Sequence, residues 1–451
     1  MPLKNISPDP KDEYFADGLT EELISTVSKV RELSVISSTS TMQYRTKSKP
    51  VVEIGRELNA GTILEGSVRK AGDKVRITVQ MIDARNDKHV WAESYDRELQ
   101  DVFAIQSEIA TKIAEELRIQ LVDFDRRMLE RHPTESTQAY TYFLQARELL
   151  RRGDEQSLRG ALKLFQRAIE LDPSFAKAYS DLADCQLALG NAGYESYQES
   201  IANAKVPLKR ALELDPNLAD AHATLSRVLM NEDDPDEEAE ARKAIELNPS
   251  LPEPYEWLAN IAEVREDTNE ILRLIETCYR LDPTRPRYIA NLGMAYFYLG
   301  REIEALELWR KTEGLEYSRN YLAIAEYYLQ KGDFERAKQL HSVAERLDPN
   351  SDWVRWLRGY IEAKTGNRDA ALLEIRKLED AKGGAACLNA IGFVYYALGD
   401  LDAYFDYLGR ALELHAVETA HVMYCPLFAE ARTDPRYQAL LEKAKKMLLT
   451  E

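Results

Sequence analysis

The apolar residues of the N-terminal region, which extends to about residue 122, recur with two different periods. A stripe with one apolar side chain every three or four positions predicts a helix and comprises Leu19, Leu23, Val27 and Val30. Asp17 is expected to cap this helix, which places Glu21 and Glu22 in its first turn. Strict alternation predicts a strand with one buried face at Val75, Ile77, Val79 and Met81.

Turn residues between the apolar runs separate the other predicted elements from one another. The turn at 71–73 joins a strand at 64–69 to the strand at 75–81 as a β-hairpin. Around this hairpin the pattern predicts a short strand at 33–38, a helix at 51–58, a strand at 89–95 and a helix at 102–121. Residues 1–122 are therefore predicted to form a small α/β sandwich with helices packed on a sheet.

Beyond residue 136 one short motif recurs along the chain. The tripeptide Leu-Asp-Pro, once as Leu-Asn-Pro, ends at Pro173, Pro216, Pro249, Pro283 and Pro349. Successive prolines lie 43, 33, 34 and 66 residues apart, and the last spacing is two units of 33. A period of about 34 residues that ends in proline is typical of helical hairpins stacked in a row.

One unit shows the residue types of this repeat most fully: Leu292, Gly293, Tyr296, Gly300, Ala305 and Trp309. The small residues let two helices approach closely, and Gly300 suits a left-handed helix end. This pattern resembles the tetratricopeptide (TPR) family. The resemblance predicts an α+β chain, with the α/β sandwich followed by an all-α TPR superhelical solenoid of about eight units at 137–416. A linker is expected at 123–136 and capping helices at 417–451.

In the TPR family, fixed positions of the first helix of each unit point into a concave groove. Their counterparts in the later units include Met294, Phe297, Trp353, Trp356, Tyr360, Phe393 and Tyr396. The resemblance implies an apolar groove for a protein or peptide segment. From the residues alone, any one of these side chains is as well explained by packing between neighbouring repeats.

Four blocks of the N-terminal region, at 15–23, 64–69, 76–80 and 91–97, resemble in order the TolB amino-terminal-like domain. In that family the domain commonly precedes TPR units. The pair is often joined to a class III adenylate cyclase, a winged-helix DNA-binding domain or a protein kinase. Met1, Pro2 and Leu3 resemble only the tail of the family's first strand. We therefore expect that strand to be truncated, and the sequence leaves open whether an upstream effector domain or membrane segment is missing.

Charge and composition narrow the classes of partner. The net charge of −18 opposes the phosphate contacts that dominate binding to nucleic acids, so we expect none. The sequence has no apolar run long enough to span a membrane and no secretory signal, which predicts a cytoplasmic protein. Cys185, Cys278, Cys387 and Cys425 lack paired spacing and are expected to be ordinary thiols.

Few residue groups invite a chemical interpretation. His415, His421 and Cys425 could ligate zinc, but no fourth ligand is apparent. The acidic run at 233–238 lacks the Gly and Glu that a calcium loop requires, which favours a solvated turn. The sequence contains no phosphate-binding loop and no nucleophile elbow. We therefore expect no catalytic residues, no metal and no cofactor.

These observations favour a non-catalytic interaction scaffold or regulatory adaptor that binds a partner segment in the TPR groove. An alternative is the regulatory C-terminal part of a signalling protein whose effector domain is missing, namely a class III adenylate cyclase, kinase or winged-helix regulator. A weaker alternative is an enzyme with an unrecognised site in the N-terminal domain. The oligomeric state, including a homo-oligomer, stays open.

Overall fold

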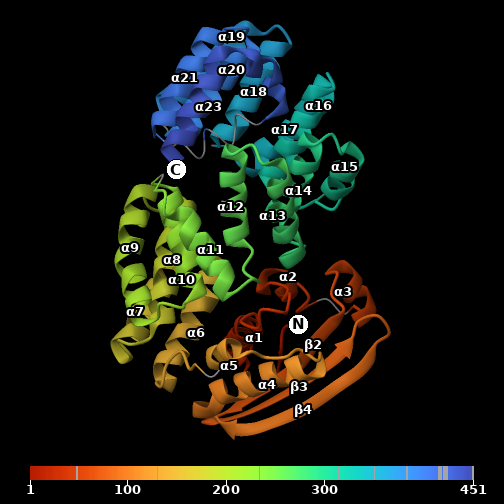
Figure 1. The fold of residues 1–451 in the computed structure, drawn as a ribbon, viewed down its shortest axis with the longest axis vertical. Coiled ribbons are helices and arrows are strands. Elements are labelled where there is room, and N and C mark those ends of the chain that lie inside the picture. The colour runs from red at the N-terminus through yellow and green to blue at the C-terminus, as the bar shows by residue number, and fades with distance from the viewer. Residues whose placement is uncertain are drawn as a thin grey trace. The chain divides into compact units, whose positions relative to one another are not determined.

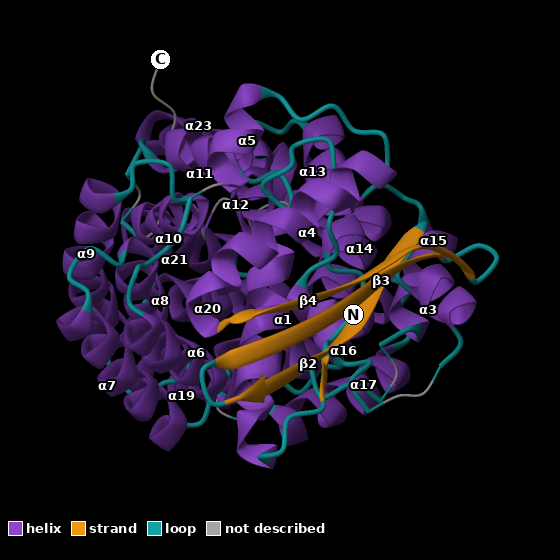
Figure 2. Ribbon diagram, turned by 90° about the horizontal axis from the view of Figure 1, so that it is seen from below, coloured by secondary structure: helices purple, strands orange, loops and turns teal. Residues whose placement is uncertain are grey.

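The alternating apolar residues at 75–81 lie in the middle of a four-stranded sheet (Figure 2). The strands are β1 (Lys4–Asn5), β2 (Thr62–Ala71), β3 (Lys74–Asp83) and β4 (Lys88–Glu98), in that order across the sheet. β1 runs parallel to β2, and the other neighbours are antiparallel. The predicted hairpin is confirmed, because Ala71 pairs with Lys74 on either side of Gly72, whose φ is 61°.

Helices cover one face of this sheet. Val75, Ile77 and Val79 are buried on that face, where α1 (Glu13–Val27) and α4 (Val102–Glu116) pack (Figure 1). The other face carries polar pairs, such as Thr78 with Ser94 at 3.0 Å. The remaining elements of this region are η1 (Pro10–Asp12), α2 (Ser38–Met42), α3 (Val51–Glu57), η2 (Leu99–Asp101) and α5 (Asp123–Leu129).

Two local predictions in this region were wrong. Residues 33–37 form a loop instead of a strand, because their backbone groups bond outside the sheet: Val35 N donates to Ser250 Oγ at 3.1 Å and Ser37 N to Leu281 O at 2.9 Å. The last helix ends at Glu116 instead of 121, since Arg118 adopts a left-handed φ of 58°. The helix predicted at 51–58 is confirmed as α3.

Helices follow one another from residue 137 to residue 414. They are α6 (Thr137–Arg152), α7 (Glu155–Leu171), α8 (Ala176–Asn191), α9 (Tyr197–Leu214), α10 (Ala219–Met230), α11 (Glu237–Leu247), α12 (Glu253–Val264), α13 (Thr268–Leu281), α14 (Pro286–Tyr298), α15 (Glu302–Arg310), α16 (Ser318–Gln330), α17 (Phe334–Leu347), α18 (Asp352–Lys364), α19 (Arg368–Ala381), α20 (Ala385–Ala397) and α21 (Leu401–Leu414). The segments η3 (Pro426–Thr433) and α23 (Pro435–Leu448) follow. This is the predicted class, a small sheet domain followed by a TPR-like helical solenoid.

The residue types of the repeat act locally as predicted. Gly300 follows α14 with a φ of 74°, and its N–H bonds to Phe297 O at 3.0 Å. Ala305 is fully buried in α15. Gly293 leaves room for Trp309, because a Cβ built on this glycine would lie 2.2 Å from the indole nitrogen. The glycine is therefore required by a close side-chain approach, not by its backbone angle.

This computed structural model describes residues 1–46, 49–129, 131–232, 234–312, 314–349, 351–381, 384–414, 419 and 425–448. The chain divides into two compact units. The N-terminal unit comprises Met1–Val228, Ala239–Pro254 and Arg280–Pro283, and the C-terminal unit comprises Leu229–Glu238, Tyr255–Tyr279 and Thr284–Glu451. None of the helices in the described ranges combines the length and the apolar composition that a membrane crossing requires.

The hydrophobic core of the N-terminal unit does not stop at the end of the sheet domain. One cluster of buried apolar residues contains the inner face of the sheet together with residues of α6, α7 and α8. Phe103 of α4 meets Tyr140 of α6 edge-on, with ring centroids 4.6 Å apart. Helix α5, in the segment predicted to be a linker, is held by the ion pair of Asp125 with Arg31 at 3.2 Å.

Candidate functional sites

The seven side chains predicted to line a groove fall into two groups in the C-terminal unit. Met294 and Phe297 of α14 pack with Trp309 and Tyr327. The other five come from α18 and α20 and belong to a second, larger cluster: Trp353, Trp356, Tyr360, Phe393 and Tyr396. Their role in binding a partner stays a prediction.

One phenyl ring from outside the repeats completes the second cluster. Phe428 of η3 stacks on Phe393, with centroids 4.4 Å apart and planes inclined by 22°, and meets Tyr396 edge-on at 5.1 Å. Tyr360 and Trp356 lie 6.4 Å and 6.5 Å from it. These five rings are buried, and their stacked, tilted and edge-to-face contacts are favourable for aromatic pairs. Phe428 lies outside the repeat register, so the repeat pattern offers no reason to single it out.

Trp353 and Met294 differ from the other candidates because they are only half buried. The guanidinium of Arg319 lies 4.2 Å from the centre of the Trp353 ring, which is close enough for a cation–π contact. Part of this indole is therefore accessible at the edge of the aromatic cluster.

A buried ionic network lies between α1 and α6 in the N-terminal unit. Arg147 of α6 contacts Glu22 at 2.5 Å and Glu21 at 3.0 Å, and Arg151 contacts Asp17 at 2.8 Å. The prediction that these glutamates lie in the first turn of a helix was wrong, because α1 begins at Glu13. The apolar stripe predicted the helix correctly but not the residue at which it begins. The acids in the middle of α1 pair with basic residues of α6, which are distant in the sequence.

The pKa values of two carboxyl groups in this network are shifted in opposite directions. Burial alone would raise the pKa of Glu22, but the cations of Lys177 and Arg147 outweigh it and lower that pKa. Asp181 lies farther from its partner, with its Oδ2 3.6 Å from Arg147 Nε, and burial raises the pKa of Asp181 to about 7. The network therefore contains one stable anion and one carboxyl group that changes charge near neutral pH.

A polar cavity of about 350 Å³ adjoins this network. Lys29 and Lys177 both line it, and Lys29 Nζ donates to Met128 O at 3.4 Å. Burial and the nearby Lys177 cation lower the pKa of Lys29. Glu22, Asp215 and Asp220 line the same space, so acidic and basic groups face each other across it.

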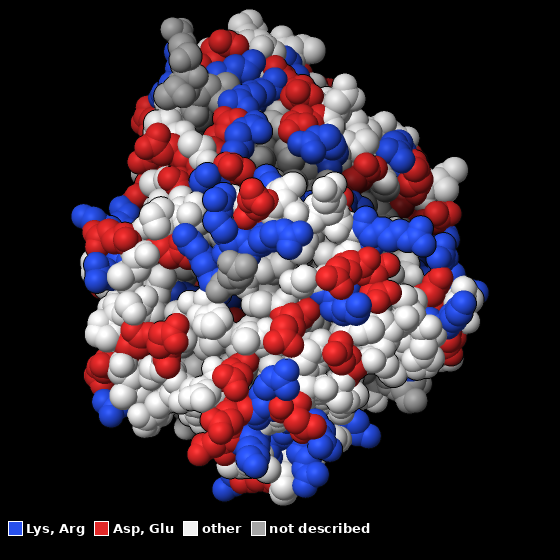
Figure 3. Space-filling model, turned by 60° about the horizontal axis from the view of Figure 1, so that its bottom comes forward, with Lys and Arg blue, Asp and Glu red and all other residues white. Residues whose placement is uncertain are grey.

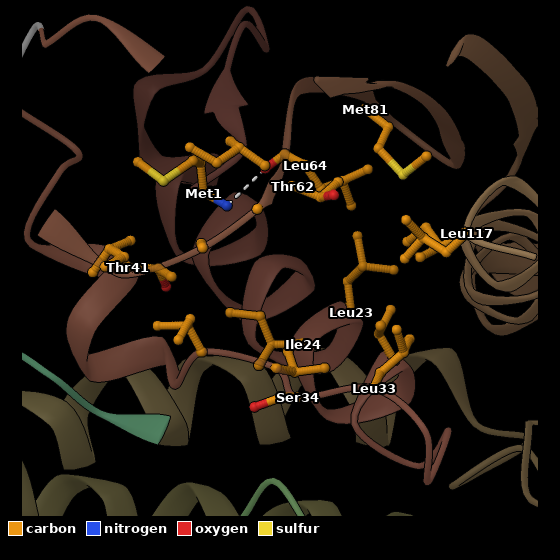
Figure 4. A pocket seen from close by; sticks show the side chains of 18 of the residues that line it. Met1, Leu23, Ile24, Leu33, Ser34, Thr41, Thr62, Leu64, Met81 and Leu117 are labelled. Carbon is orange, nitrogen blue, oxygen red and sulfur yellow. Dashed lines mark hydrogen bonds between the residues drawn. The ribbon is translucent and has the colours of Figure 1, made fainter. Parts of the chain in front are cut away.

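An apolar cavity of about 440 Å³ lies in the sheet domain between α1, the loop at 33–36 and the start of β2 (Figure 4). Leu23, Ile24 and Leu64 point into it, and Met1 N donates to Leu64 O at 2.7 Å. The hydroxyl of Thr20 is used internally, since it donates to Ala16 O and accepts from Leu3 N. The cavity can thus enclose an apolar group but offers little to orient a polar one.

The described residues contain no group of three or more His, Cys, Asp or Glu side chains arranged to hold a metal ion. His415 and His421 of the predicted zinc trio, and Asp233 of the acidic run, lie outside the described residues. Cys425 is buried, and its thiol donates to Glu326 at 3.6 Å. All four cysteines lie among the described residues, where they are buried and form no disulfide, and burial raises the pKa of Cys185 to about 12.

Figure 3 shows both acidic and basic side chains on the face drawn, in groups separated by wide areas of uncharged residues. On the outer face of the sheet, for example, Arg76 pairs with Asp96 at 2.7 Å. Pairing of this kind neutralises cations that a protein surface would need in order to bind the phosphates of a nucleic acid.

Family models match both parts of the chain. The model described as "HilA/YgeH-like transcriptional regulator, second domain" matches residues 9–114. Two models described as "Tetratricopeptide repeat" match residues 164–194 and 385–417. The chain carries TPR repeats. The TolB-type resemblance stays a prediction, since the model that matches the same region has a different description.

Known proteins resemble parts of the chain. "Putative adenylate cyclase 3" of Rhizobium meliloti (strain 1021) is 37% identical over 183 residues, which are 41% of this chain and 31% of that protein. The chain thus spans about a third of the length of this relative. PilF of Pseudomonas aeruginosa is 22% identical with a TM-score of 0.36, over 48% of this chain and 96% of that chain. The TPR protein TTC0263 of Thermus thermophilus is 21% identical with a TM-score of 0.32, over 44% and 100%.

Proposed function

We propose that the chain is a non-catalytic regulatory adaptor that binds a segment of a partner protein on its TPR helices. The observation that carries this proposal is the TPR repeat itself. Such helical pairs bury their apolar faces against neighbouring pairs and leave a row of first helices to bind extended or helical peptide segments. The half-exposed indole of Trp353, on the first helix of its pair, is the side chain we assign as a partner contact.

Capture of partners by the full chain from native lysate, followed by titration of the purified partner, tests this function. Replacing Trp353 with Ala is expected to weaken binding about tenfold, because aromatic anchors carry a large share of interface energy. Tyr407→Ala serves as the control, since Tyr407 lies on α21 and donates to Glu379 at 2.9 Å. A partner that binds both variants as well as the unchanged chain would contradict the assignment of Trp353, and the absence of any protein partner would contradict the function.

The similarity to a protein named as an adenylate cyclase favours a second candidate, the regulatory part of a signalling enzyme. We propose that the chain then changes the activity of a cyclase catalytic domain on which it acts. The purified chain, added to the catalytic part of the Rhizobium relative, should alter the rate of cyclic AMP formation from ATP. An unchanged rate at saturating chain would oppose this candidate.

We also propose a cytoplasmic location and no direct contact with duplex nucleic acid. The net charge of −18 supports the second point, because repulsion from phosphates rises with acidic charge. The match to a domain of a transcriptional regulator makes the question worth testing. The fluorescence anisotropy of a labelled DNA duplex at low salt should not change when the chain is added, and saturable, salt-sensitive binding would contradict the proposal.

A further inference from the structure

The segment from Cys425 to Thr433 lies against side chains of three helices that begin repeat pairs in the C-terminal unit. These side chains share one face of each helix and recur at helical spacing: Glu326 on α16, Trp356 and Tyr360 on α18, and Asn389, Phe393 and Tyr396 on α20. Asn389 is included by its position one turn before Phe393 on α20, and its Nδ2 donates at 3.4 Å to the hydroxyl of Thr419, which precedes the segment. We call this set the groove face.

Phe428 fills the groove face as a single anchor. Its ring is buried among the aromatic side chains of α18, α20 and α21, and Ala431, one helical turn later, is buried as well. A large aromatic side chain in a pocket lined by other rings is the arrangement by which peptide segments bind protein grooves. The segment therefore occupies this face as a bound peptide would.

The fit leaves buried polar atoms unpaired. Among the described residues, the indole N–H of Trp356, the hydroxyl of Tyr404 and the amide oxygen of Asn389 have no hydrogen-bond partner. Buried polar groups are ordinarily paired, and each unpaired one opposes the state that contains it. An occupant that presents a carbonyl to Trp356 and an N–H to Asn389 would satisfy atoms that the segment does not.

We propose that Cys425–Thr433 occupies a peptide-binding groove in cis, and that a partner segment with an aromatic anchor in the place of Phe428 displaces it. This rests on the proposed function, since it names the groove and the class of segment that the adaptor binds. The groove is closed in the free chain and opens when the partner competes for the same aromatic pocket. The apparent affinity for the partner segment is therefore lower than the affinity of the open groove, because only the chains with an unfilled groove can bind.

The test uses the full chain and a fluorescein-labelled peptide with the sequence of residues 419–433. Phe428→Ala in the full chain is expected to bind this peptide about tenfold more tightly than the unchanged chain, because the cis anchor no longer competes. Phe405→Ala is the matched control: it also removes a buried phenyl group from α21, but within the described residues Phe405 has no ring contact with Phe428. It should bind the peptide as weakly as the unchanged chain, and a peptide carrying Phe428→Ala should bind none of the three.

Equal affinity of the Phe428→Ala and unchanged chains would overturn the proposal. If Phe428→Ala loses helicity, native-state hydrogen exchange of the unchanged chain decides instead. Amides of 427–431 should exchange about tenfold faster than those of α18 through local release, whereas exchange at the same rate would show a permanent part of the core and overturn the proposal. A protein partner that binds all variants equally would sustain the adaptor function while this cis groove fails.

Discussion

At the scale of single residues, two glycines occupy the same repeat position on different first helices. Gly293 faces Trp309, and a Cβ there would lie 2.2 Å from the indole nitrogen and 2.7 Å from Cδ1. Gly392 has nothing closer than 3.4 Å to the same built atom. These two glycines are equivalent in the repeat, but only the site of Gly392 has room for a larger side chain.

Replacing Gly293 with Ala should lower the free energy of unfolding by about 1–3 kcal/mol, because Trp309 is buried between Phe297 and Tyr327 and cannot move aside. Gly392→Ala is the matched control and should be neutral or stabilising by up to about 1 kcal/mol, since Ala favours a helix over Gly. Urea unfolding of the three chains measures both effects. Equal losses in the two variants would contradict the close-contact explanation.

Asp181 gives the N-terminal unit a pH dependence of known sign. Its pKa in the folded chain is raised to about 7, chiefly by burial. The cations of Arg147 and Lys177 lower this pKa, whereas the nearby carboxylates of Asp220 and Glu22 raise it. Between about pH 7 and the ordinary range of an aspartate, the folded chain thus holds more protons than the unfolded chain. Stability from this group is complete at low pH and is lost as the pH rises through about 7.

We therefore expect the free energy of unfolding to increase as the pH falls from about 7 to about 5, and Asp181→Asn to remove much of this increase. Glu22 does not cancel it, because the stability that its lowered pKa contributes is lost only at more acidic pH. Urea unfolding at several pH values gives the slope directly. A variant with the same slope as the unchanged chain would assign the effect to another group.

At the scale of elements, the loop at 33–37 and α2 depend on the end of α13. Ser40 Oγ donates to the Asp282 carboxylate at 2.5 Å, and both residues are fully buried. Ser40→Ala should cost about 1–3 kcal/mol, because it takes a donor from a buried carboxylate. Ser38→Ala, in the same helix but partly exposed, is expected to stay within about 0.5 kcal/mol of the unchanged chain.

Hydrogen exchange of the amides in α2 distinguishes local from global loss. Ser40→Ala should speed exchange in α2 and in the preceding loop more than in the sheet, because the contact holds this segment alone. Uniform acceleration across the N-terminal unit would show that Asp282 supports the whole core instead of one element.

The same elements show what the pattern of residues can and cannot predict. The hairpin of β2 and β3 and the helical pairs follow from local periodicity, and the structure has them. Val35 and Ile36 favour a strand by residue type, yet their conformation is set by partners such as Ser250, which is 215 positions away. No local pattern contains that information.

The aromatic candidates show the same division. The repeat register places Trp356, Tyr360, Phe393 and Tyr396 on the first helices of two neighbouring units, and they lie in one cluster. Phe428, which completes the cluster, comes from outside the register and contacts the others only through the tertiary fold. Periodicity therefore identifies the helices that form a face but not what covers that face.

At the scale of the whole molecule, the sheet domain and the first TPR helices share one core. Gly18 of α1 shows how close they come, since a Cβ on it would lie 2.6 Å from a methyl carbon of Leu144 on α6. Three acids of α1 have their partners on α6 and α8: Asp17, Glu21 and Glu22. A sheet domain cut free would expose this apolar surface and deprive Glu21 and Glu22 of Arg147 and Lys177, while Asp17 would keep only its ion pair with Arg45.

We therefore expect a fragment of residues 1–129 to lack fixed tertiary structure, and a fragment of residues 1–254 to fold. The longer fragment retains the apolar partners of α1 and α4 and the cations Arg147, Arg151 and Lys177. Near-ultraviolet circular dichroism and the thermal transition of each fragment test this, because a shared core unfolds as one cooperative unit. If residues 1–129 melt cooperatively at the same temperature as residues 1–254, the sheet domain is independent, and a change within it reaches the TPR helices without passing through a common core.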